Sequence, residues 1–323
     1  MYPDFFNWSI RLIFISLLIF FSARVFSQDT LKVHKNNREF GLIYDNDIVF
    51  FSDKYYTSGL DFTYARIIQP ASYLKRFFTS SNDTSKAILR FNYGHKIYTP
   101  EKIMEMDLEN RDRPYAGWHY LTARVSTFPK NNRSNHFSAE LGLVGKVSGI
   151  GNFQEWYHKV TGIVAPEGWE SQIANEFIIN LKYSRVQSFR IGEVMDVIAE
   201  TDIQGGNGQS FLSVAGTVRF GRLNNMNNSA YTDSRLSNVM PSASWAEYED
   251  QEEGFLFYGL KGQYVFNNVF IQGSLFNDRS PHQEKIENIL ITQQIGYMYS
   301  NYYTTVKATV YILSKEVVGG KRG

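Results

Sequence analysis

The chain of 323 residues carries 33 lysine and arginine residues against 32 aspartate and glutamate residues, a formal net charge of +1. This balance excludes the clustered basic face that nucleic-acid binding needs, and the absence of cysteine excludes a disulfide framework, a thiolate metal site and a cysteine nucleophile. Phenylalanine and tyrosine number 25 and 21, although the mean hydropathy is only -0.31. An apolar lipid face combined with polar loops and a polar lumen gives outer-membrane barrels such a composition.

The N-terminal residues are typical of a secretory signal peptide. Arg11 precedes the apolar run 12–21, and residues 23–27 end in a small residue before Gln28. We expect residues 1–27 to be a signal peptide that is removed on export, and residues 28–323 to form one barrel domain in the bacterial outer membrane. The apolar run is short for a membrane-spanning helix of about 20 residues, and an uncleaved anchor is the alternative.

Alternating runs of strand length recur along the remaining chain, separated by turns rich in Asn, Asp, Ser and Gly. The predicted strands are 38–51, 56–69, 87–97, 116–128, 135–147, 174–187, 188–198, 209–222, 255–267, 268–278, 288–300 and 302–314. Several are long enough to cross a membrane at a tilt, whereas strands of a secreted β-sandwich, the soluble alternative, are shorter. The pattern predicts an all-β fold, a closed antiparallel transmembrane β-barrel of about 12 strands. The tail after Leu313 has no role in it.

Longer polar insertions interrupt this pattern. They are 70–86, 98–115, 148–173, 199–208 and 223–253. The third is expected to hold a short helix near 153–161, because Phe153, Trp156, Tyr157 and Val160 recur at helical spacing.

An acidic cluster, Asp45, Asn46 and Asp47, interrupts the apolar first strand. Burying a carboxylate without a partner costs several kcal/mol. On a strand Asp45 and Asp47 share one face and Asn46 lies opposite, unless a bulge re-aims it. Since calcium prefers carboxylate and amide oxygens, we predict a cation site here, with the Thr57 hydroxyl near the same end of the hairpin. The alternative is a solvated polar patch on the lumen side.

His158 is the candidate general base. It follows Gln154 by four residues, so both side chains share one face of the predicted helix. An imidazole near neutral pH can take a proton from water, as ester or amide hydrolysis requires. A surface histidine on an amphipathic helix is the plainer alternative.

Arg111 and Arg113 precede a strand and are candidates for binding a phosphate or carboxylate through the planar guanidinium group. A salt-bridge cluster at a barrel rim is the alternative. Trp169 fits an anchor at the membrane interface. The chain lacks a G-x-S-x-G elbow, an H-E-x-x-H motif, a P-loop and a dinucleotide fingerprint, so a serine hydrolase has no support.

Five short motifs follow one another along the chain. They are Asn46-Asp47, Asp53-x-x-Tyr56-Thr57-x-Gly59, Asp112-Arg113-Pro114-Tyr115-Ala116-Gly117-Trp118, Gln154-x-x-x-His158 and Gly168-Trp169-x-x-Gln172. Together they resemble the lipid A 3′-O-deacylase (LpxR) family. The resemblance implies an outer-membrane barrel enzyme that needs a divalent cation, typically Ca²⁺, and hydrolyses the ester holding the 3′ acyloxyacyl group on lipid A.

The resemblance also implies roles for individual residues. His158 would be the general base that activates water. Asn46, Asp47 and Thr57 would line the cation and oxyanion site, and Asp45 would add negative charge behind them.

Two positions depart from the family pattern. The family has a lysine in the loop after residues 97–100, where this chain has only Lys102 nearby. The family also has an acid shortly after the histidine, at a position near Val164 in this chain. Glu167 is the expected substitute for that acid as a metal ligand. The predicted substrate-binding residues are Arg111, Arg113, Lys102 and Gln154.

We therefore expect a monomeric, calcium-dependent ester hydrolase that acts on the lipid A of lipopolysaccharide at the outer-leaflet end of the barrel wall. Two alternatives stay open. One is an outer-membrane phospholipase, since the same ester chemistry serves other lipids. The other is a porin or structural barrel without enzymatic activity, in which the acidic strand tunes the lumen.

Overall fold

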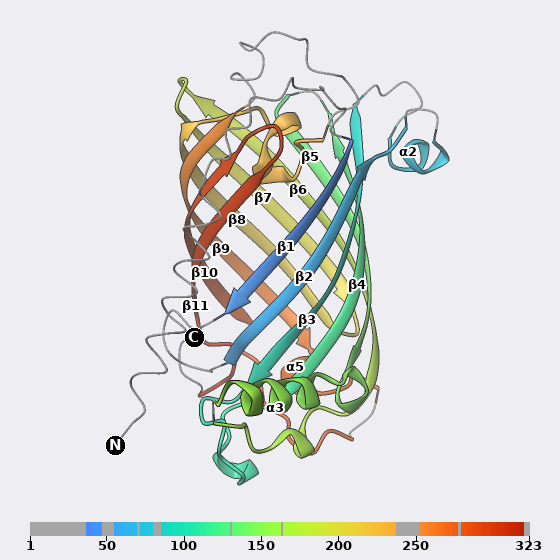
Figure 1. The fold of residues 1–323 in the computed structure, drawn as a ribbon, viewed down its shortest axis with the longest axis vertical. Helices are drawn as coiled ribbons and strands as arrows, with labels where there is room; N and C mark the ends of the chain where they lie inside the picture. The colour runs from blue at the N-terminus through green and yellow to red at the C-terminus, as the bar shows by residue number, and fades with distance from the viewer. Residues whose placement is uncertain are drawn as a thin grey trace. The chain divides into compact units, whose positions relative to one another are not determined.

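The computed structural model describes residues 37–46, 55–69, 72–79, 85–129, 131–162, 164–236, 252–276 and 279–319. Eleven strands form one antiparallel sheet in which each strand pairs with its neighbours along the chain. Figure 1 shows this sheet curling around an interior. Within the described ranges no ladder joins the first strand to the last, so closure of the barrel and a twelfth strand stay predictions. The predicted signal peptide lies outside the described residues.

The strands are β1 (Arg38–Asn46), β2 (Tyr55–Ile67), β3 (Lys86–Thr99), β4 (Ala116–Phe128), β5 (Arg133–Val144), β6 (Glu176–Ile191), β7 (Met195–Gly206), β8 (Gln209–Arg222), β9 (Glu253–Asn268), β10 (Ile289–Ser300) and β11 (Thr305–Leu313). The helices are α2 (Tyr73–Phe78), α3 (Ile150–Thr161) and α5 (Val269–Gln272), with 3₁₀ turns η2 (Leu108–Asn110), η3 (Lys146–Ser148), η4 (Trp169–Ser171), η5 (Met226–Asn228) and η6 (Ala230–Thr232). No helix in this part of the chain has the length and hydropathy to cross a membrane.

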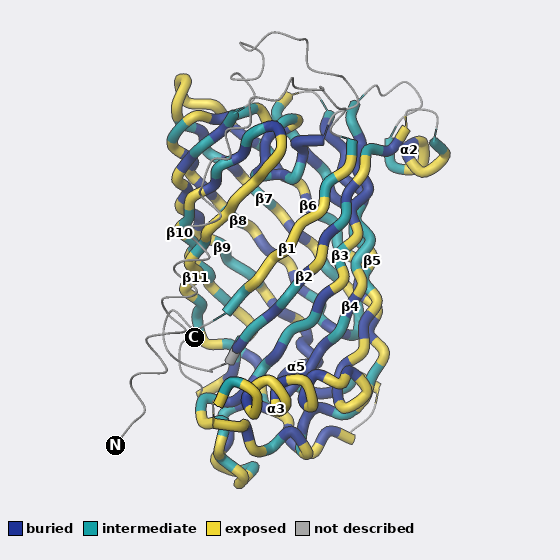
Figure 2. Tube along the Cα trace, in the orientation of Figure 1, coloured by how far each residue is buried: buried dark blue, intermediate teal, exposed yellow. Residues whose placement is uncertain are grey.

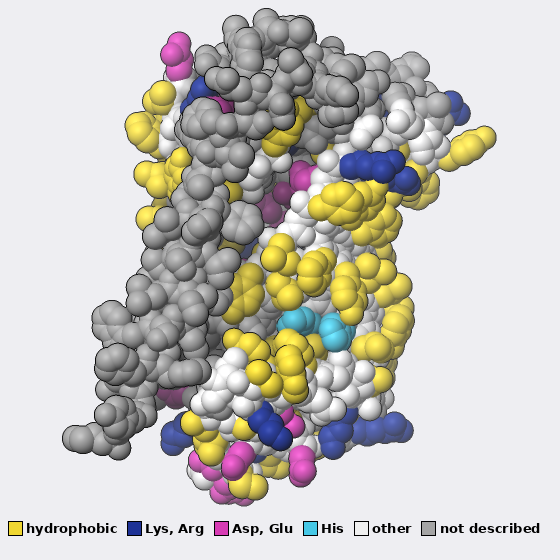
Figure 3. All heavy atoms as spheres, viewed as in Figure 1, with side chains coloured by type: hydrophobic (Ala, Val, Ile, Leu, Met, Phe, Trp, Pro, Cys, Tyr) yellow, Lys and Arg dark blue, Asp and Glu magenta, His cyan; other side chains and the backbone are white. Residues whose placement is uncertain are grey.

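The sheet is apolar outside and polar inside. On β8, Leu212 and Val214 are exposed, whereas Ser213 and Thr217 are buried. Figure 2 shows this alternation of buried and exposed positions along the strands, and Figure 3 shows hydrophobic side chains over the outer surface. Since a soluble protein has the opposite arrangement, the outer surface is suited to lipid and the inner face forms a polar lumen.

The predicted boundaries between β6 and β8 are wrong. β6 continues to Ile191, and β7 runs through the predicted loop 199–208, so the predicted strand 188–198 spans the turn between them. Gly192 permits that turn because its φ is 69°. The stretch reads as a loop because its lumen-facing positions, such as the buried Asp202, are polar, and polarity in a barrel strand marks the lumen face.

The predicted strand 268–278 is also wrong, because the chain forms α5 there. The Asn268 side chain caps this short helix by accepting a hydrogen bond of 3.0 Å from the Phe270 amide. Val269 and Phe270 are buried. The sequence pattern predicts a strand here because the run is apolar, but its side chains pack into a buried cluster.

An aromatic cluster around α5 closes one end of the lumen. The Phe270 ring centre lies 4.7 Å from that of Trp118 and 5.2 Å from that of Tyr98. The cluster also contains Ala116, Tyr120, Val144, Ile173, Ile178 and Val269. Packing of this kind excludes water from that end of the interior.

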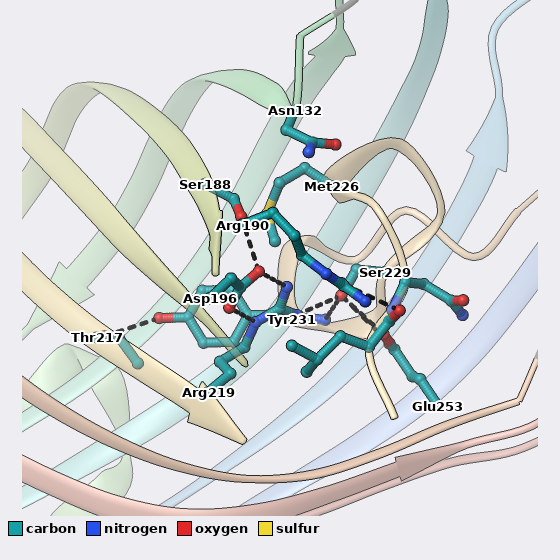
Figure 4. A network of polar contacts seen from close by, with 12 residues as sticks. Asn132, Ser188, Arg190, Asp196, Thr217, Arg219, Met226, Ser229, Tyr231 and Glu253 are labelled. Atoms are coloured by element: carbon teal, nitrogen blue, oxygen red, sulfur yellow. Dashed lines mark hydrogen bonds and ion pairs between the residues drawn. The ribbon is translucent and has the colours of Figure 1, made fainter. Parts of the chain in front are cut away.

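Residues 223–236, which follow β8, lie inside the sheet; Figure 4 shows Ser229 and Tyr231 of this segment beside Asp196 and Arg219. Arg219 of β8 is fully buried and contacts Asp196 of β7 through two hydrogen bonds of 2.9 and 2.6 Å. Its third donor bonds to the Ser229 hydroxyl at 2.8 Å, and that hydroxyl donates to Glu253 of β9 at 3.0 Å. Each buried charge therefore has a partner, as burial requires.

The same segment reaches the other side of the sheet. Asp233 contacts Arg124 of β4 and lies 3.7 Å from Arg90 of β3. Leu236 packs in a cluster with Ile88 and residues of β2 and β4. Residues 223–236, here called the plug segment, therefore connect opposite walls across the interior.

A polar cavity of about 180 Å³ lies in the lumen. Its lining residues come from β3 to β7 and are Asn92, Thr122, Arg124, Ser138, Glu140, Asn180, Lys182 and Gln204. A polar cavity of this size suits water bound to these groups.

Candidate active site

The helix predicted near 153–161 is confirmed as α3. It ends at Thr161, and Gly162, whose φ is 71°, caps it by donating its amide hydrogen to the His158 carbonyl oxygen. The buried side of α3 consists of Ile150, Gly151, Gln154 and His158, and the exposed side carries Phe153, Trp156, Tyr157 and Val160. Two polar side chains therefore face the protein while aromatic side chains face outward, the reverse of the usual amphipathic helix.

The outer wall of β3 and β4 holds α3. Ile150 packs in one cluster with Ile97 of β3, and Gly117 of β4 allows this approach because a Cβ there would lie 2.5 Å from the Ile150 Cβ. The His119 Nδ1–H donates to the Ser148 carbonyl oxygen, 2.7 Å away, just before the helix begins. These contacts place α3 on the lipid-facing side of the sheet (Figure 1).

Trp169 orients the Gln154 side chain. The indole Nε1–H donates to Gln154 Oε1 over 2.9 Å, and because an indole can only donate, the amide cannot be flipped. Its NH₂ group must then point elsewhere, and Nε2 has no hydrogen-bond partner in the described structure although Gln154 is 2% exposed. Trp169 is 3% exposed, so its interpretation as an interfacial anchor is wrong.

Gln172 is oriented by the same tryptophan. Its Nε2 donates to the Trp169 carbonyl oxygen at 2.8 Å, which leaves Oε1 as a buried acceptor without a partner among the described residues. Buried polar atoms normally find partners. Two unmet donor hydrogens and one unmet acceptor around Trp169 therefore mark a place for a water molecule or a polar group of a ligand.

His158 lies on the same buried side of α3 as Gln154 and is 3% exposed. Its Nδ1 is 2.6 Å from the Val164 carbonyl oxygen. Since a carbonyl only accepts, Nδ1 carries the proton and Nε2 holds the lone pair of the neutral ring. The family pattern expects an acid near Val164, where this chain has none. The main-chain carbonyl of Val164 orients the imidazole instead.

Asp45 and Asn46 lie on opposite faces at the end of β1. In the strand register Asn46 is opposite Ser58, which is opposite Ile97, and Ile97 contacts the helix on the outer wall. Asp45 instead accepts a hydrogen bond of 3.3 Å from the Tyr56 hydroxyl. Asn46 therefore faces the side that carries α3, and Asp45 faces the lumen.

Thr57 occupies an irregular position in β2. The register shifts between Tyr56 and Ser58, which makes Thr57 the additional residue of a bulge. Its hydroxyl lies 2.8 Å from that of Thr99, and both side chains are buried. Thr99 follows Ile97 by two residues and so shares its outer face. Amide and hydroxyl oxygens thus gather on the α3 side of β1 to β3.

The described residues give a partial fit to a calcium site. Asp47 lies outside them, and among those described no three His, Cys, Asp or Glu side chains lie close enough to hold a metal ion. The oxygens of Asn46, Thr57 and Thr99 are hard donors of the type that calcium accepts, but they are neutral. A carboxylate is needed beside them, and Asp47 follows Asn46 directly in the sequence. The oxygens of the described residues suit calcium in kind, and a calcium ion held together with Asp47 stays a prediction.

Arg111 and Arg113 are buried and bonded within the chain. Arg111 donates to the Glu105 carbonyl oxygen at 2.6 Å. Arg113 lies 3.1 Å from Glu316 Oε2 and over the ring of Tyr98. The C-terminal tail, which has no role in the sequence pattern, thus supplies the carboxylate for a buried arginine. Phosphate binding by either arginine stays a prediction.

Lys102 and Glu167 lie on neighbouring loops. Both side chains are exposed, and the Glu167 amide donates to the Ile103 carbonyl oxygen at 2.8 Å. The loop after β3 and the loop after α3 are therefore joined directly. Headgroup binding by the exposed Lys102 stays a prediction.

Sequence reasoning missed Thr99 and the orienting role of Trp169. The position of Thr99 opposite Thr57 depends on a bulge, which no spacing in the sequence reveals. The role of Trp169 could have been inferred, because a donor-only indole near Gln154 and Gln172 is suited to orienting amides.

The family model described as "Outer membrane protein LpxR" matches residues 12–323. Among solved structures, the chain is similar to "LpxR from Salmonella typhimurium", with a TM-score of 0.64 and 18% identity over 84% of this chain and 86% of that chain. At this identity the likeness shows a shared fold. The β domain of the Bordetella autotransporter BrkA gives a TM-score of 0.37 at 9% identity over 86% and 90% of the two chains, which is too low to support an argument. No curated protein matches the sequence.

Proposed function

The chain belongs to the LpxR family of outer membrane proteins, and from this membership and the buried polar side of α3 we propose that it is a lipid A deacylase. The proposed reaction is hydrolysis of the ester that links the 3′ acyloxyacyl group to lipid A. The protein acts as a monomer on lipopolysaccharide in the outer leaflet, with a calcium ion in its site. Family membership supports the location in the outer membrane and the choice of lipid A as substrate.

The observation that carries this proposal is the pairing of Gln154 and His158 between a helix and an apolar wall. A polar pair with one oriented imidazole and one oriented amide costs free energy to bury. It lies where the outer surface meets lipid and not in the lumen. A lipid ester that lies against the wall can approach this pair once α3 moves, whereas a solute passing through a pore would not.

His158 carries out the proton transfers in this proposal. Nε2 accepts a proton from water as the water oxygen bonds to the ester carbonyl carbon. The imidazolium, held by the Val164 carbonyl at Nδ1, then gives that proton to the departing sugar oxygen as the acyl–oxygen bond breaks. The products are the free acyloxyacyl acid and lipid A with a 3′ hydroxyl, so atoms and protons balance.

Gln154 and the oxygens at the end of β1 to β3 have separate tasks. The Gln154 NH₂ group, fixed by Trp169, is a donor for the oxygen that gains negative charge. Asn46, Asp47 and the Thr57 region would hold the calcium ion, which would supply positive charge near the same oxygen. Asp45, on the lumen face, contributes only long-range negative charge.

The experiment that tests the proposal is mass spectrometry of lipid A from cells that express the wild-type chain or His158→Ala. We expect loss of one 3′ acyloxyacyl unit with the wild type and unchanged lipid A with the variant. Lys159→Ala is the matched control, since Lys159 is the next residue of α3 and is exposed. Unaltered activity of a folded His158→Ala protein would remove the histidine from the mechanism.

The same experiment separates the alternatives. Hydrolysis of phospholipid with lipid A left intact would select a phospholipase. Ion conductance in planar bilayers would select a porin, but the lumen argues against one. The plug segment crosses one end of the described lumen, and the aromatic cluster around α5 occupies the other.

A further inference from the structure

Helix α2 projects from the outer wall at the end of the sheet opposite α3 (Figure 1). It begins after Ser72, whose hydroxyl accepts a hydrogen bond of 3.2 Å from the Leu74 amide. Tyr73 and Phe77 are 87% and 83% exposed, among the most exposed large side chains of the described structure. Two such aromatic residues on one short helix need an explanation, because water-exposed aromatic surface of this extent is uncommon.

Aromatic contacts attach α2 to the lipid-facing wall. The ring centres of Phe78 and Phe137 of β5 are 5.0 Å apart, and those of Phe137 and Tyr183 of β6 are 4.8 Å apart. Phe137 and Tyr183 are paired across the two strands. The helix therefore continues an aromatic row of the outer wall, and its exposed residues lie next to surface that already faces lipid.

Arginine residues surround this end of the wall. Arg38 and Arg66 are cross-strand partners at the same end of β1 and β2, and both are exposed. Arg76 of α2 is exposed, and its guanidinium carbon lies 5.9 Å from the centre of the Tyr73 ring. Aromatic side chains beneath cationic ones match the headgroup region of a bilayer, where rings meet the acyl boundary and arginines meet phosphates.

Strand β5 separates α2 from α3 along the wall. Phe137, which contacts Phe78 of α2, is the fifth of its 12 residues, and α3 follows beyond the end of the strand at Val144. At about 3.3 Å per residue and a tilt of about 40°, the strand rises roughly 18 Å from Phe137 to Val144. Since this is more than half of the hydrocarbon core, which is about 30 Å thick, the two helices lie toward opposite faces of the membrane.

We propose that α2 is an interfacial anchor that inserts Tyr73 and Phe77 into the phospholipid headgroup region of the leaflet opposite to the candidate active site. Arg38, Arg66 and Arg76 bind lipid phosphates beside it. The anchor fixes how deeply the barrel wall lies in the membrane, and so the height of α3 relative to the other leaflet. This role does not depend on the proposed hydrolase activity.

The absence of cysteine makes a direct test possible. Phe77→Cys and Tyr73→Cys each introduce a single thiol, which is labelled with a nitroxide after reconstitution into vesicles of phosphatidylethanolamine and phosphatidylglycerol. Glu193→Cys is the matched control, because it lies in the exposed turn between β6 and β7 at the same end of the sheet. Power saturation compares collisions with oxygen, which partitions into lipid, and with a water-soluble nickel chelate.

We expect the ratio of oxygen to nickel accessibility to be several-fold higher at positions 77 and 73 than at position 193. Equal ratios at all three positions would place α2 in water and overturn the proposal. Protection of positions 77 and 73 from both reagents would also overturn it, because it would show burial against protein. Heat-modifiable migration of each labelled variant on gels checks that the barrel is folded.

Discussion

The most discriminating perturbation is Trp169→Phe. Phenylalanine keeps an aromatic ring against Gly151 and Tyr115 but lacks the indole N–H that fixes Gln154. Without that donor the amide can rotate and place its oxygen where the NH₂ group was. We therefore expect a loss of turnover with little change in KM, because the oriented donor acts on the charge that develops only in the transition state.

The expected magnitude follows from the hydrogen bond that is removed. A buried acceptor left without its donor costs about 1–3 kcal/mol, and Gln154 Oε1 is in that position because its side chain is 2% exposed. If this cost falls on the transition state, kcat decreases roughly 5- to 150-fold. A larger decrease would indicate that α3 itself has moved.

The assay is the rate of 3′ deacylation of purified lipid A in detergent, followed by mass spectrometry. Gln154→Glu should reproduce the loss, because a carboxylate still accepts from the indole but has no N–H to donate. Trp156→Phe is the control, since Trp156 is exposed on the other side of α3. Full turnover by a folded Trp169→Phe protein would refute the idea that the orientation of Gln154 matters for catalysis.

Three further predictions concern charge. Asn46→Ala should abolish activity while Asp45→Asn changes it only a few-fold, because the strand register places only Asn46 on the α3 side; equal losses would contradict this assignment. A chelator should stop deacylation without unfolding the barrel, and calcium should restore it better than magnesium, which demands a stricter geometry; activity that survives chelation would exclude the metal. Burial favours the neutral acid of Asp233, but two arginine partners hold its pKa below the usual value, so its contribution to stability is present above the unfolded pKa and is lost on acidification. The midpoint temperature of unfolding should decrease as the pH is lowered below about 4. An Asp233→Asn variant that keeps this whole dependence on pH would contradict the assignment.

Alternation of apolar and polar residues was sufficient to predict a strand's bounds where one face of the strand meets lipid. The predicted strand 209–222 has the same bounds as β8 because Leu212 and Val214 alternate with small or polar residues. The four-residue spacing of Gln154 and His158 likewise identified the buried side of α3. These features depend on local periodicity, which tertiary contacts only reinforce.

Features that depend on tertiary contacts could not be predicted from the sequence. The run after Asn268 is apolar because α5 closes the lumen, yet it reads as a strand. The polar face of β7 reads as a loop because its charges, such as Asp202, have partners on other strands: Lys182 and Lys261 lie 3.3 and 3.0 Å away. The opposite directions of Asp45 and Asn46 could be predicted, but which of them faces the lumen is set by pairing with distant strands.

We predict that access to the site requires movement of α3. His158 and Gln154 are 3% and 2% exposed, so an ester carbonyl cannot reach them while the helix lies against the wall. Gly149 and Gly162, each with φ of 71°, flank the helix, and we predict that α3 swings about them as a unit when lipid enters. Cysteines in place of His95 and Phe153, whose rings are 5.4 Å apart across this contact, joined by a short reducible cross-linker, should stop deacylation until reduction. Undiminished turnover by the cross-linked protein would show that lipid enters by another route.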